Sequence, residues 1–142
     1  MLRRLTHRFL RNAGLPDSLS VSVLLVGDRL MKSYNRTLFN TNTLTDVISI
    51  RYPPLPGEPS EYAEIILNVD EAARHPTLPG GKSWSFAHEL CLYLAHGCDH
   101  LSGWDDRTPA GRRRMRRREL RWLRDAERDG LIQNLIKPAT TQ

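Results

Sequence analysis

Cysteine is scarce in this sequence, and long apolar runs are absent. Two cysteines among 142 residues are too few to hold a fold together with disulfide bonds, so we expect a reducing compartment, the cytoplasm. The apolar runs, such as the mostly apolar residues 21–26, are far shorter than the roughly 20 residues that cross a bilayer. The sequence therefore excludes both a disulfide-rich secreted protein and a membrane protein.

Acidic residues are outnumbered, and the basic residues are mostly of one type. The chain has 16 Asp and Glu against 21 Lys and Arg, of which only three are lysine, and its net charge is +5. Arginine binds phosphate oxygens through paired N–H groups, so this bias favours a phosphate-rich partner. A hydrophobic fraction of 39% and a charged fraction of 26% are typical of a globular domain, and we expect a single one over residues 1–142.

The N-terminal segment lacks the apolar stretch of a secretory signal. Leucine and phenylalanine recur at helical spacing over residues 2–12, with arginines between them, and Gly14 follows. This pattern predicts a first helix that packs on the sheet and ends near the glycine. An arginine-rich mitochondrial transit peptide is the alternative.

Hydrophobic periodicity and turn residues predict eight short elements. Strands are expected over residues 19–26, 45–50 and 63–69, and helices over residues 2–12, from Asp28 (as N-cap) to Leu38, over residues 70–74, from Ser83 or Ser85 to about His100, and from Thr108-Pro109 to near Gly130. This order predicts an α+β fold with a small mixed sheet covered by helices. The helix with the candidate metal site precedes a long basic C-terminal helix.

His96 and His100 have the clearest chemistry. They are four apart in a predicted helix, so both imidazoles project from one face with Cβ atoms about 5–6 Å apart, a spacing that suits one divalent ion. Gly103 ends that helix, and the turn brings Asp105 or Asp106 toward the same ion. Two histidines and a carboxylate leave a position open for water, as in catalytic sites. The alternative is a pair of partly exposed histidines that bind no ion.

Other residues of this helix are expected to have structural roles. A metalloprotease needs a glutamate directly after the first histidine as its general base, and Gly97 stands there instead. His88 lies about 12 Å away along the helix axis, too far to share the ion. Cys91 and Cys98 are predicted to be buried thiols rather than ligands.

Three segments resemble the YbeY-type endoribonucleases, a bacterial family of rRNA maturation factors. The family signature His-Gly-x-Leu-His-Leu-x-Gly-Tyr-Asp-His is similar to residues 96–106, His-Gly-Cys-Asp-His-Leu-Ser-Gly-Trp-Asp-Asp. An asparagine followed by Pro-Thr-Asp-Val-Leu-Ser-Phe resembles Asn35 and residues 44–50, and Gly-Asp-Ile-Val-Ile before a Glu-Ala helix start resembles residues 63–72. The order and spacing of these segments agree over residues 21–118.

The resemblance implies a zinc-dependent hydrolase that cuts single-stranded RNA with a metal-activated water, in small-subunit rRNA maturation and ribosome quality control. His96 and His100 match the first two ligands of the single zinc ion. The third ligand is a histidine in the family and Asp106 here, an acceptable oxygen ligand that shifts the preference toward harder ions. Asp99 and Asp105 are expected to lie beside the site, where Asp99 accepts a hydrogen bond that orients an imidazole.

The family also places an arginine six residues before the threonine of Thr-Asp-Val, and here this position holds Phe39. Arg36, one helical turn earlier, is the candidate to stabilise charge on the phosphate in its place. If no cation reaches the phosphate, the chain is instead a non-catalytic RNA- or ribosome-binding relative with the same fold.

Arginine dominates the last predicted helix, with eight arginines between residues 112 and 124. Four of them are predicted to bind RNA phosphates beside the metal site: Arg112, Arg113, Arg116 and Arg117. A solvated helix face, partly paired with acidic neighbours such as Glu119, is the alternative. The predicted buried stripe of this helix consists of Met115, Trp122, Leu123 and Ala126.

Overall fold

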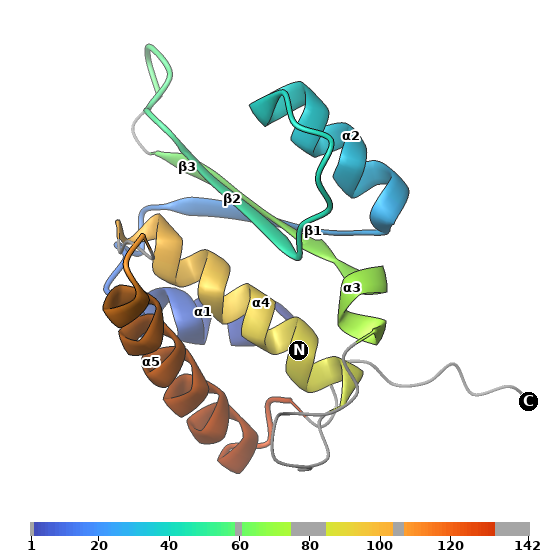
Figure 1. Cartoon of the computed structure of the whole chain (residues 1–142). Coiled ribbons are helices and arrows are strands. Elements are labelled where there is room, and N and C mark those ends of the chain that lie inside the picture. Colours follow the sequence, from blue (N-terminus) through green and yellow to red (C-terminus); the bar gives the residue numbers. More distant parts are fainter. Residues whose placement is uncertain (1, 59–60, 75–84, 104–106, 133–142) are drawn as a thin grey trace, which may run out of the picture.

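The structure is a computed structural model, and it describes residues 2–58, 61–74, 85–103 and 107–132. In chain order its elements are α1 (Leu2–Asn12), β1 (Ser20–Val26), α2 (Asp28–Phe39), β2 (Val47–Tyr52), β3 (Tyr62–Asn68), α3 (Val69–Ala73), α4 (Phe86–Leu101) and α5 (Pro109–Arg128) (Figure 1). This order confirms the predicted order and the α+β class. None of the helices in the described ranges is long and apolar enough to cross a membrane.

The three strands form one mixed sheet in the order β1-β3-β2. β3 lies in the middle, parallel to β1 and antiparallel to β2. The prediction of a buried strand over residues 19–26 is wrong for most of its length, because β1 is an edge strand on which Leu24 and Leu25 are exposed. A run of apolar residues predicts a strand, but whether neighbours cover the strand depends on the tertiary arrangement.

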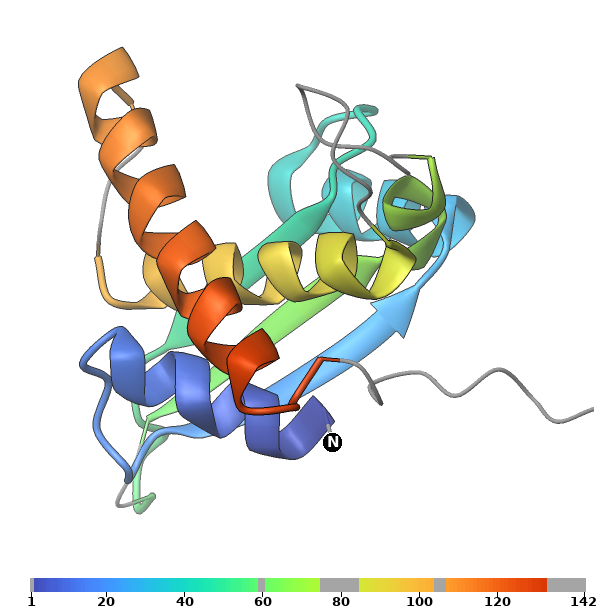
Figure 2. The same cartoon turned by 90° about the horizontal axis from the view of Figure 1, so that it is seen from below.

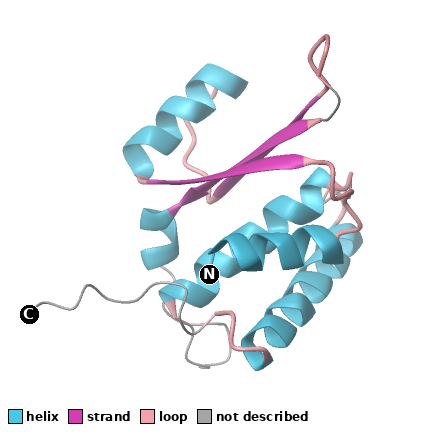
Figure 3. Ribbon diagram, turned by 180° about the vertical axis from the view of Figure 1, so that it is seen from behind, coloured by secondary structure: helices cyan, strands magenta, loops and turns pink. Residues whose placement is uncertain are grey.

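Helices cover the two faces of the sheet unequally (Figures 1 and 2). On one face α4 packs on β2 and β3, and α1 and α5 pack against α4. This side holds the larger part of the core, including Ala63, Ile65 and Leu67 of β3. On the other face α2 contributes Met31 to a small cluster with Ile66. The view from behind shows the same division, with α2 alone on its side of the strands (Figure 3). Consequently α4 is surrounded by the sheet, α1 and α5.

Side-chain caps set the starts of the last two helices. Ser85 accepts a hydrogen bond from the backbone N–H of His88 at the start of α4, and Thr108 accepts one from Gly111 at the start of α5. Both caps satisfy backbone donors that a first helical turn leaves unpaired. They confirm Ser85 and Thr108 as predicted helix starts.

The start of α2 differs from the prediction. Gly27 is its N-cap and Asp28 is its first residue, with no side-chain cap. The Asp28 carboxylate instead accepts hydrogen bonds from both Nη atoms of Arg74 and from Asn68 Nδ2. The Arg74 guanidinium, with help from Asn68, lowers the pKa of Asp28 to about 2. This carboxylate therefore links α2 to the residue that follows α3.

Candidate active site

The two histidines that were predicted to bind a metal meet near the C-terminal end of α4. The rings of His96 and His100 are nearly perpendicular, with centroids 4.4 Å apart, and their Nε2 atoms are 2.9 Å apart. The helix ends at Leu101, and Gly103 follows with φ of 93°, a conformation that favours glycine. Helical spacing thus brings the two nitrogen atoms to one point, as the sequence predicted.

A buried glutamate from α5 holds the first of these histidines. Glu119 Oε2 lies 2.9 Å from His96 Nδ1, and only 1% of the Glu119 side chain is exposed. A carboxylate accepts hydrogen bonds, so Nδ1 of the neutral ring carries the proton and the lone pair stays on Nε2, the atom that faces His100. This is the tautomer with which a histidine binds a metal through Nε2.

The sequence interpretation missed Glu119 and treated it as a partner for surface arginines. Its position carried a usable signal, because it lies four residues after Met115 and three before Trp122, on the same helical face. Both of these stripe residues are buried as predicted, as are Leu123 and Ala126. A carboxylate within such a stripe needs a partner in the core, and His96 is that partner.

Asp99 is also buried in this region, and its partner is an arginine of α5. Asp99 Oδ1 accepts a hydrogen bond from Arg118 Nη2 at 2.6 Å, while Oδ2 has no hydrogen-bond partner among the described residues. Burial raises the pKa of the Asp99 carboxyl to about 6, although the Arg118 guanidinium opposes this shift. The expected role of Asp99 as an acceptor for an imidazole stays a prediction, and the carboxylate seen on His96 is that of Glu119.

Gly97 explains why the protease alternative fails in three dimensions. A Cβ atom at this position would lie 2.9 Å from Ile65 Cγ2 and 3.3 Å from Val47 Cγ2. The glycine therefore lets α4 lie directly on the sheet. A glutamate at position 97 would point into the sheet and away from the paired imidazole nitrogens, so it could not serve as the base of a metalloprotease.

The donor atoms in this region suit a divalent metal ion. Two imidazole nitrogens on one tetrahedral zinc ion, with bonds of about 2.0 Å, are separated by roughly 3.3 Å, close to the 2.9 Å between the Nε2 atoms of His96 and His100. Asp105 and Asp106, the predicted neighbouring carboxylates, lie outside the described residues. Within the described ranges, no third His, Cys, Asp or Glu completes a metal-binding cluster.

A cleft of about 400 Å³ opens beside His100. Its described lining residues come from the end of α2, from the segment leading into β2, from β2 itself and from the end of α4: Asn35, Phe39, Thr45, Val47, Ile48, Ser49, Arg51, His100 and Leu101. The segments around Asn35 and residues 45–49, which were singled out in the sequence, therefore meet the second histidine. Its position beside His100 makes this cleft the candidate substrate site.

Two positions of particular interest differ in their relation to this cleft. Phe39 is 51% exposed and belongs to the lining, whereas Arg36 is not among the described lining residues and its Nε is 3.4 Å from Asn42 Oδ1. The role of Arg36 at a phosphate stays a prediction. Arg51, which the sequence interpretation did not consider, is the arginine that the described lining contains.

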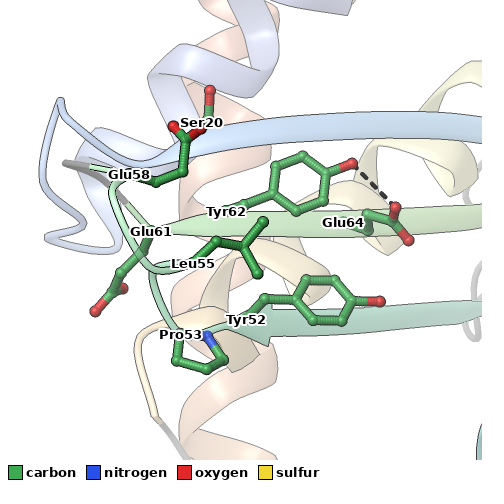
Figure 4. A pocket seen from close by; sticks show the side chains of 8 residues that line it. All are labelled: Ser20, Tyr52, Pro53, Leu55, Glu58, Glu61, Tyr62 and Glu64. Carbon is green, nitrogen blue, oxygen red and sulfur yellow. Dashed lines mark hydrogen bonds between the residues drawn. The ribbon is translucent and has the colours of Figure 1, made fainter.

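A second cavity, of about 480 Å³, lies on the face of the sheet that points away from α4 (Figure 4). The rings of Tyr52 and Tyr62 stack there with centroids 5.7 Å apart, and the Tyr62 hydroxyl donates a hydrogen bond to Glu64. Glu58 and Glu61 also line this cavity. Three carboxylates repel phosphate groups, so this cavity is a poor site for a nucleic acid backbone.

The two cysteines are buried, whereas the four candidate RNA-binding arginines are exposed. Both cysteines are free and buried, and burial raises the pKa of Cys91 to about 12, so these thiols are structural as predicted. The four candidate RNA-binding arginines are all exposed on α5: Arg112, Arg113, Arg116 and Arg117. Their exposure leaves both the RNA-binding and the solvated-helix interpretations open.

Comparison with known proteins adds independent information. A family model described as Endoribonuclease YbeY matches residues 1–127. A protein of Geobacter metallireducens named Endoribonuclease YbeY is 33% identical over 138 residues, which cover 92% of this chain and 88% of that protein. Proteins of the same name from Anaeromyxobacter sp. (strain Fw109-5) and Symbiobacterium thermophilum are each 35% identical, over 87% and 81% of this chain. The chain spans 62% of the Anaeromyxobacter protein and 78% of the Symbiobacterium protein.

Proposed function

Because this chain belongs to the Endoribonuclease YbeY family, we propose that it cleaves single-stranded RNA internally and that it needs a bound divalent metal ion, preferably zinc. The observation that carries this proposal is the convergence of the Nε2 atoms of His96 and His100 beside an open cleft. A buried carboxylate fixes one of the two rings, which is how proteins orient histidine ligands.

We assign the metal site to His96, His100 and Asp106, with one ion. When bound, such an ion supplies a Lewis acid and makes water acidic enough to ionise near neutral pH. Asp106 in place of a third histidine adds an oxygen donor, which zinc accepts and which manganese or magnesium prefer. Asp105 and Asp99 are assigned to the surroundings of the ion rather than to its ligands.

The chain's own groups position the RNA. Glu119 keeps the proton on His96 Nδ1, and the hydroxyl groups of Thr45 and Ser49 in the cleft lining offer hydrogen bonds to ribose or base atoms. The exposed residues Arg112, Arg113, Arg116 and Arg117 of α5 attract the phosphate backbone of the RNA. Their attraction carries no sequence information.

The biological substrate that we propose is rRNA of the small ribosomal subunit, in its maturation and in ribosome quality control, within the cytoplasm. The basis is the resemblance of the motifs around Asn35, Thr45 and His96 to a family of rRNA maturation factors. The net charge of +5 is consistent with a substrate as rich in phosphate as a ribosomal particle.

The direct test is cleavage of a short fluorescent single-stranded RNA by the zinc-loaded protein, with a duplex of the same sequence as comparison. The wild type should cut the single strand, and both His96→Ala and His100→Ala should lower the rate at least about a hundredfold. His7→Ala is the matched control, because His7 is exposed on α1, and it should cut like the wild type. Equal activity in all four proteins would refute the assigned site.

The arginines of α5 are tested by affinity. Replacing Arg113, Arg116 and Arg117 by Gln should weaken RNA binding and lower the slope of log affinity against log salt by about 2, at roughly 0.7 per lost contact on a single strand. The control removes the same charge from α1 by replacing Arg3, Arg4 and Arg11, which are also exposed. If both triple variants lose affinity equally, net charge acts and α5 has no special role.

A non-catalytic RNA- or ribosome-binding relative is the second candidate. It is favoured by Phe39, whose apolar ring lies in the cleft lining where a cation would bind a phosphate. This candidate predicts that the protein binds zinc and RNA tightly but cuts no RNA under any condition of metal or pH. A metal analysis of protein purified without added zinc or chelator complements this test, since one equivalent of zinc favours the hydrolase.

A further inference from the structure

Arg51 forms part of the wall of the cleft beside His100. It lies on β2 two residues after Ser49 and four after Val47, so all three side chains are on the face of the strand that meets α4. Among the lining residues that the structure describes, Arg51 is the one with a permanent charge, and none of them is acidic. A phosphodiester that enters this cleft therefore meets a single fixed positive charge.

Two contacts hold the Arg51 guanidinium in place. Nε donates to Glu61 Oε2 at 2.5 Å, and Nη1 donates to the backbone carbonyl of Leu101 at 3.0 Å. Leu101 directly follows His100, so the cation is held next to the end of the metal-site helix. The Arg51 side chain is 36% exposed, and these two partners occupy only part of its five N–H donors within the ranges described.

We propose that Arg51 binds the phosphodiester group that is cut, and that it stabilises the negative charge that develops on the nonbridging oxygens. This proposal rests on the proposed function and names the residue that recognises the phosphate in the same cleft. A guanidinium suits this role, because it donates paired hydrogen bonds to phosphate oxygens and keeps its proton throughout. The contacts to Leu101 and Glu61 orient it before the substrate arrives, which is the condition for electrostatic catalysis.

Glu61 competes with the phosphate for the same guanidinium. The pair is partly exposed on both sides, with 36% of Arg51 and 39% of Glu61 accessible, and such pairs contribute little to stability. A carboxylate at this place also repels an incoming phosphate. Its removal should therefore strengthen RNA binding, whereas a purely structural clamp between β2 and α4 would be weakened by the same change.

The experiment compares Arg51→Gln, Arg51→Lys and the matched control Arg29→Gln, which removes an exposed arginine of α2 that is not among the described lining residues. Arg36→Gln is measured alongside them, because Arg36 is the rival candidate for the same role. At saturating single-stranded RNA, Arg51→Gln should cut at least about tenfold more slowly, and Arg51→Lys should be intermediate because it keeps the charge and loses the fork. Arg29→Gln should stay within about twofold of the wild type. Zinc affinity and unfolding temperature should be the same in all of these proteins.

A second pair of variants separates phosphate binding from a structural role. Without metal, the Glu61→Gln protein should bind a short single-stranded RNA more tightly than the wild type does. Adding Phe39→Arg to Arg51→Gln should restore part of the lost rate, since Phe39 lines the same cleft. Tighter binding and rescue support the proposal even if Arg51→Gln lowers stability, whereas weaker binding by Glu61→Gln together with no rescue would overturn it.

Further outcomes are also decisive. If the wild type cuts RNA and Arg51→Gln cuts equally well, the inference on Arg51 is wrong while the proposed function stands; if Arg36→Gln is the slow variant, Arg36 has the role instead. If the wild type cuts no RNA, the proposed function fails, and binding of metal-free protein to a short RNA decides about Arg51. Arg51→Gln must then lower the salt slope by about 0.7, and an unchanged slope overturns the inference.

Discussion

Two histidine–glutamate pairs join α4 to α5, and only one of them belongs to the candidate active site. His88 Nε2 lies 2.7 Å from Glu127 Oε1 near the start of α4, and His96 Nδ1 lies 2.9 Å from Glu119 Oε2 near its end. The histidines are eight residues apart, and so are the glutamates. Because the two helices run antiparallel, one spacing brings both pairs together.

Burial and the second ring nitrogen distinguish the pairs. The side chain of Glu127 is 45% exposed, whereas that of Glu119 is 1% exposed. His88 Nδ1 faces the Ser85 hydroxyl at the helix start, while His96 Nε2 faces the Nε2 atom of His100. The same pair of residue types thus links two helix ends in one place and, in the other, directs an imidazole nitrogen of His96 toward His100.

The largest difference is expected when each histidine is removed in turn. His96→Ala should lower zinc affinity by more than about a thousandfold, because a ligand is lost from a site with few ligands. His88→Ala should leave zinc affinity within about twofold. Competition titrations with a chromogenic chelator measure both, and an equal loss in the two variants would erase the distinction between the pairs.

Replacing Glu119 should lower zinc affinity more than replacing Glu127 does, but the difference should be smaller than for the two histidines. Glu119→Gln keeps the shape of the side chain and removes its charge, so we expect zinc affinity to fall ten- to a hundredfold, as for other partners of metal-bound histidines. Glu127→Gln is the matched control and should bind zinc like the wild type. A Glu119→Gln protein with unchanged affinity and fold would show that the buried carboxylate has only a structural role.

The close contact of α4 with the sheet near His96 should be needed both for stability and for zinc binding. Gly97→Ala would place a methyl group 2.9 Å from Ile65 Cγ2, so we expect the free energy of unfolding to fall by about 1 kcal/mol, at the low end for overpacking. Zinc affinity should also fall, because His96 and His100 are on the displaced turns. Denaturant titration measures stability, and hydrogen exchange should show the loss of protection near residue 97 rather than near His88.

The smallest effect is expected from the exposed pair. A double-mutant cycle with His88→Ala and Glu127→Ala should give a coupling energy below about 0.5 kcal/mol, the usual size for exposed ion pairs. The measurement uses the unfolding midpoints of the wild type, both single variants and the double variant. A coupling of several times this size would mean that exposure underestimates the contribution of this pair.

Much of the fold could be predicted because it depends on residues close together in sequence. The order of the eight elements, the caps at Ser85 and Thr108 and the helix-ending Gly103 follow from periodicity and from contacts within one helical turn. The meeting of His96 and His100 follows from the same helical geometry. Asp106, the predicted third ligand, lies outside the described residues, and its role stays a prediction.

What the sequence by itself determined about this protein is therefore local: which segments are helices and strands, and that two imidazoles share a helix face. Only the tertiary structure decided that β1 is an edge strand, that Glu119 is the buried partner of His96 across 23 positions of the chain, and that Arg51 contacts Leu101 across 50. Periodicity shows which face of an element is buried, but not which residue it meets there. That choice depends on how α4 packs on the sheet and how α5 packs on α4, which is set by long-range packing and burial rather than by local spacing.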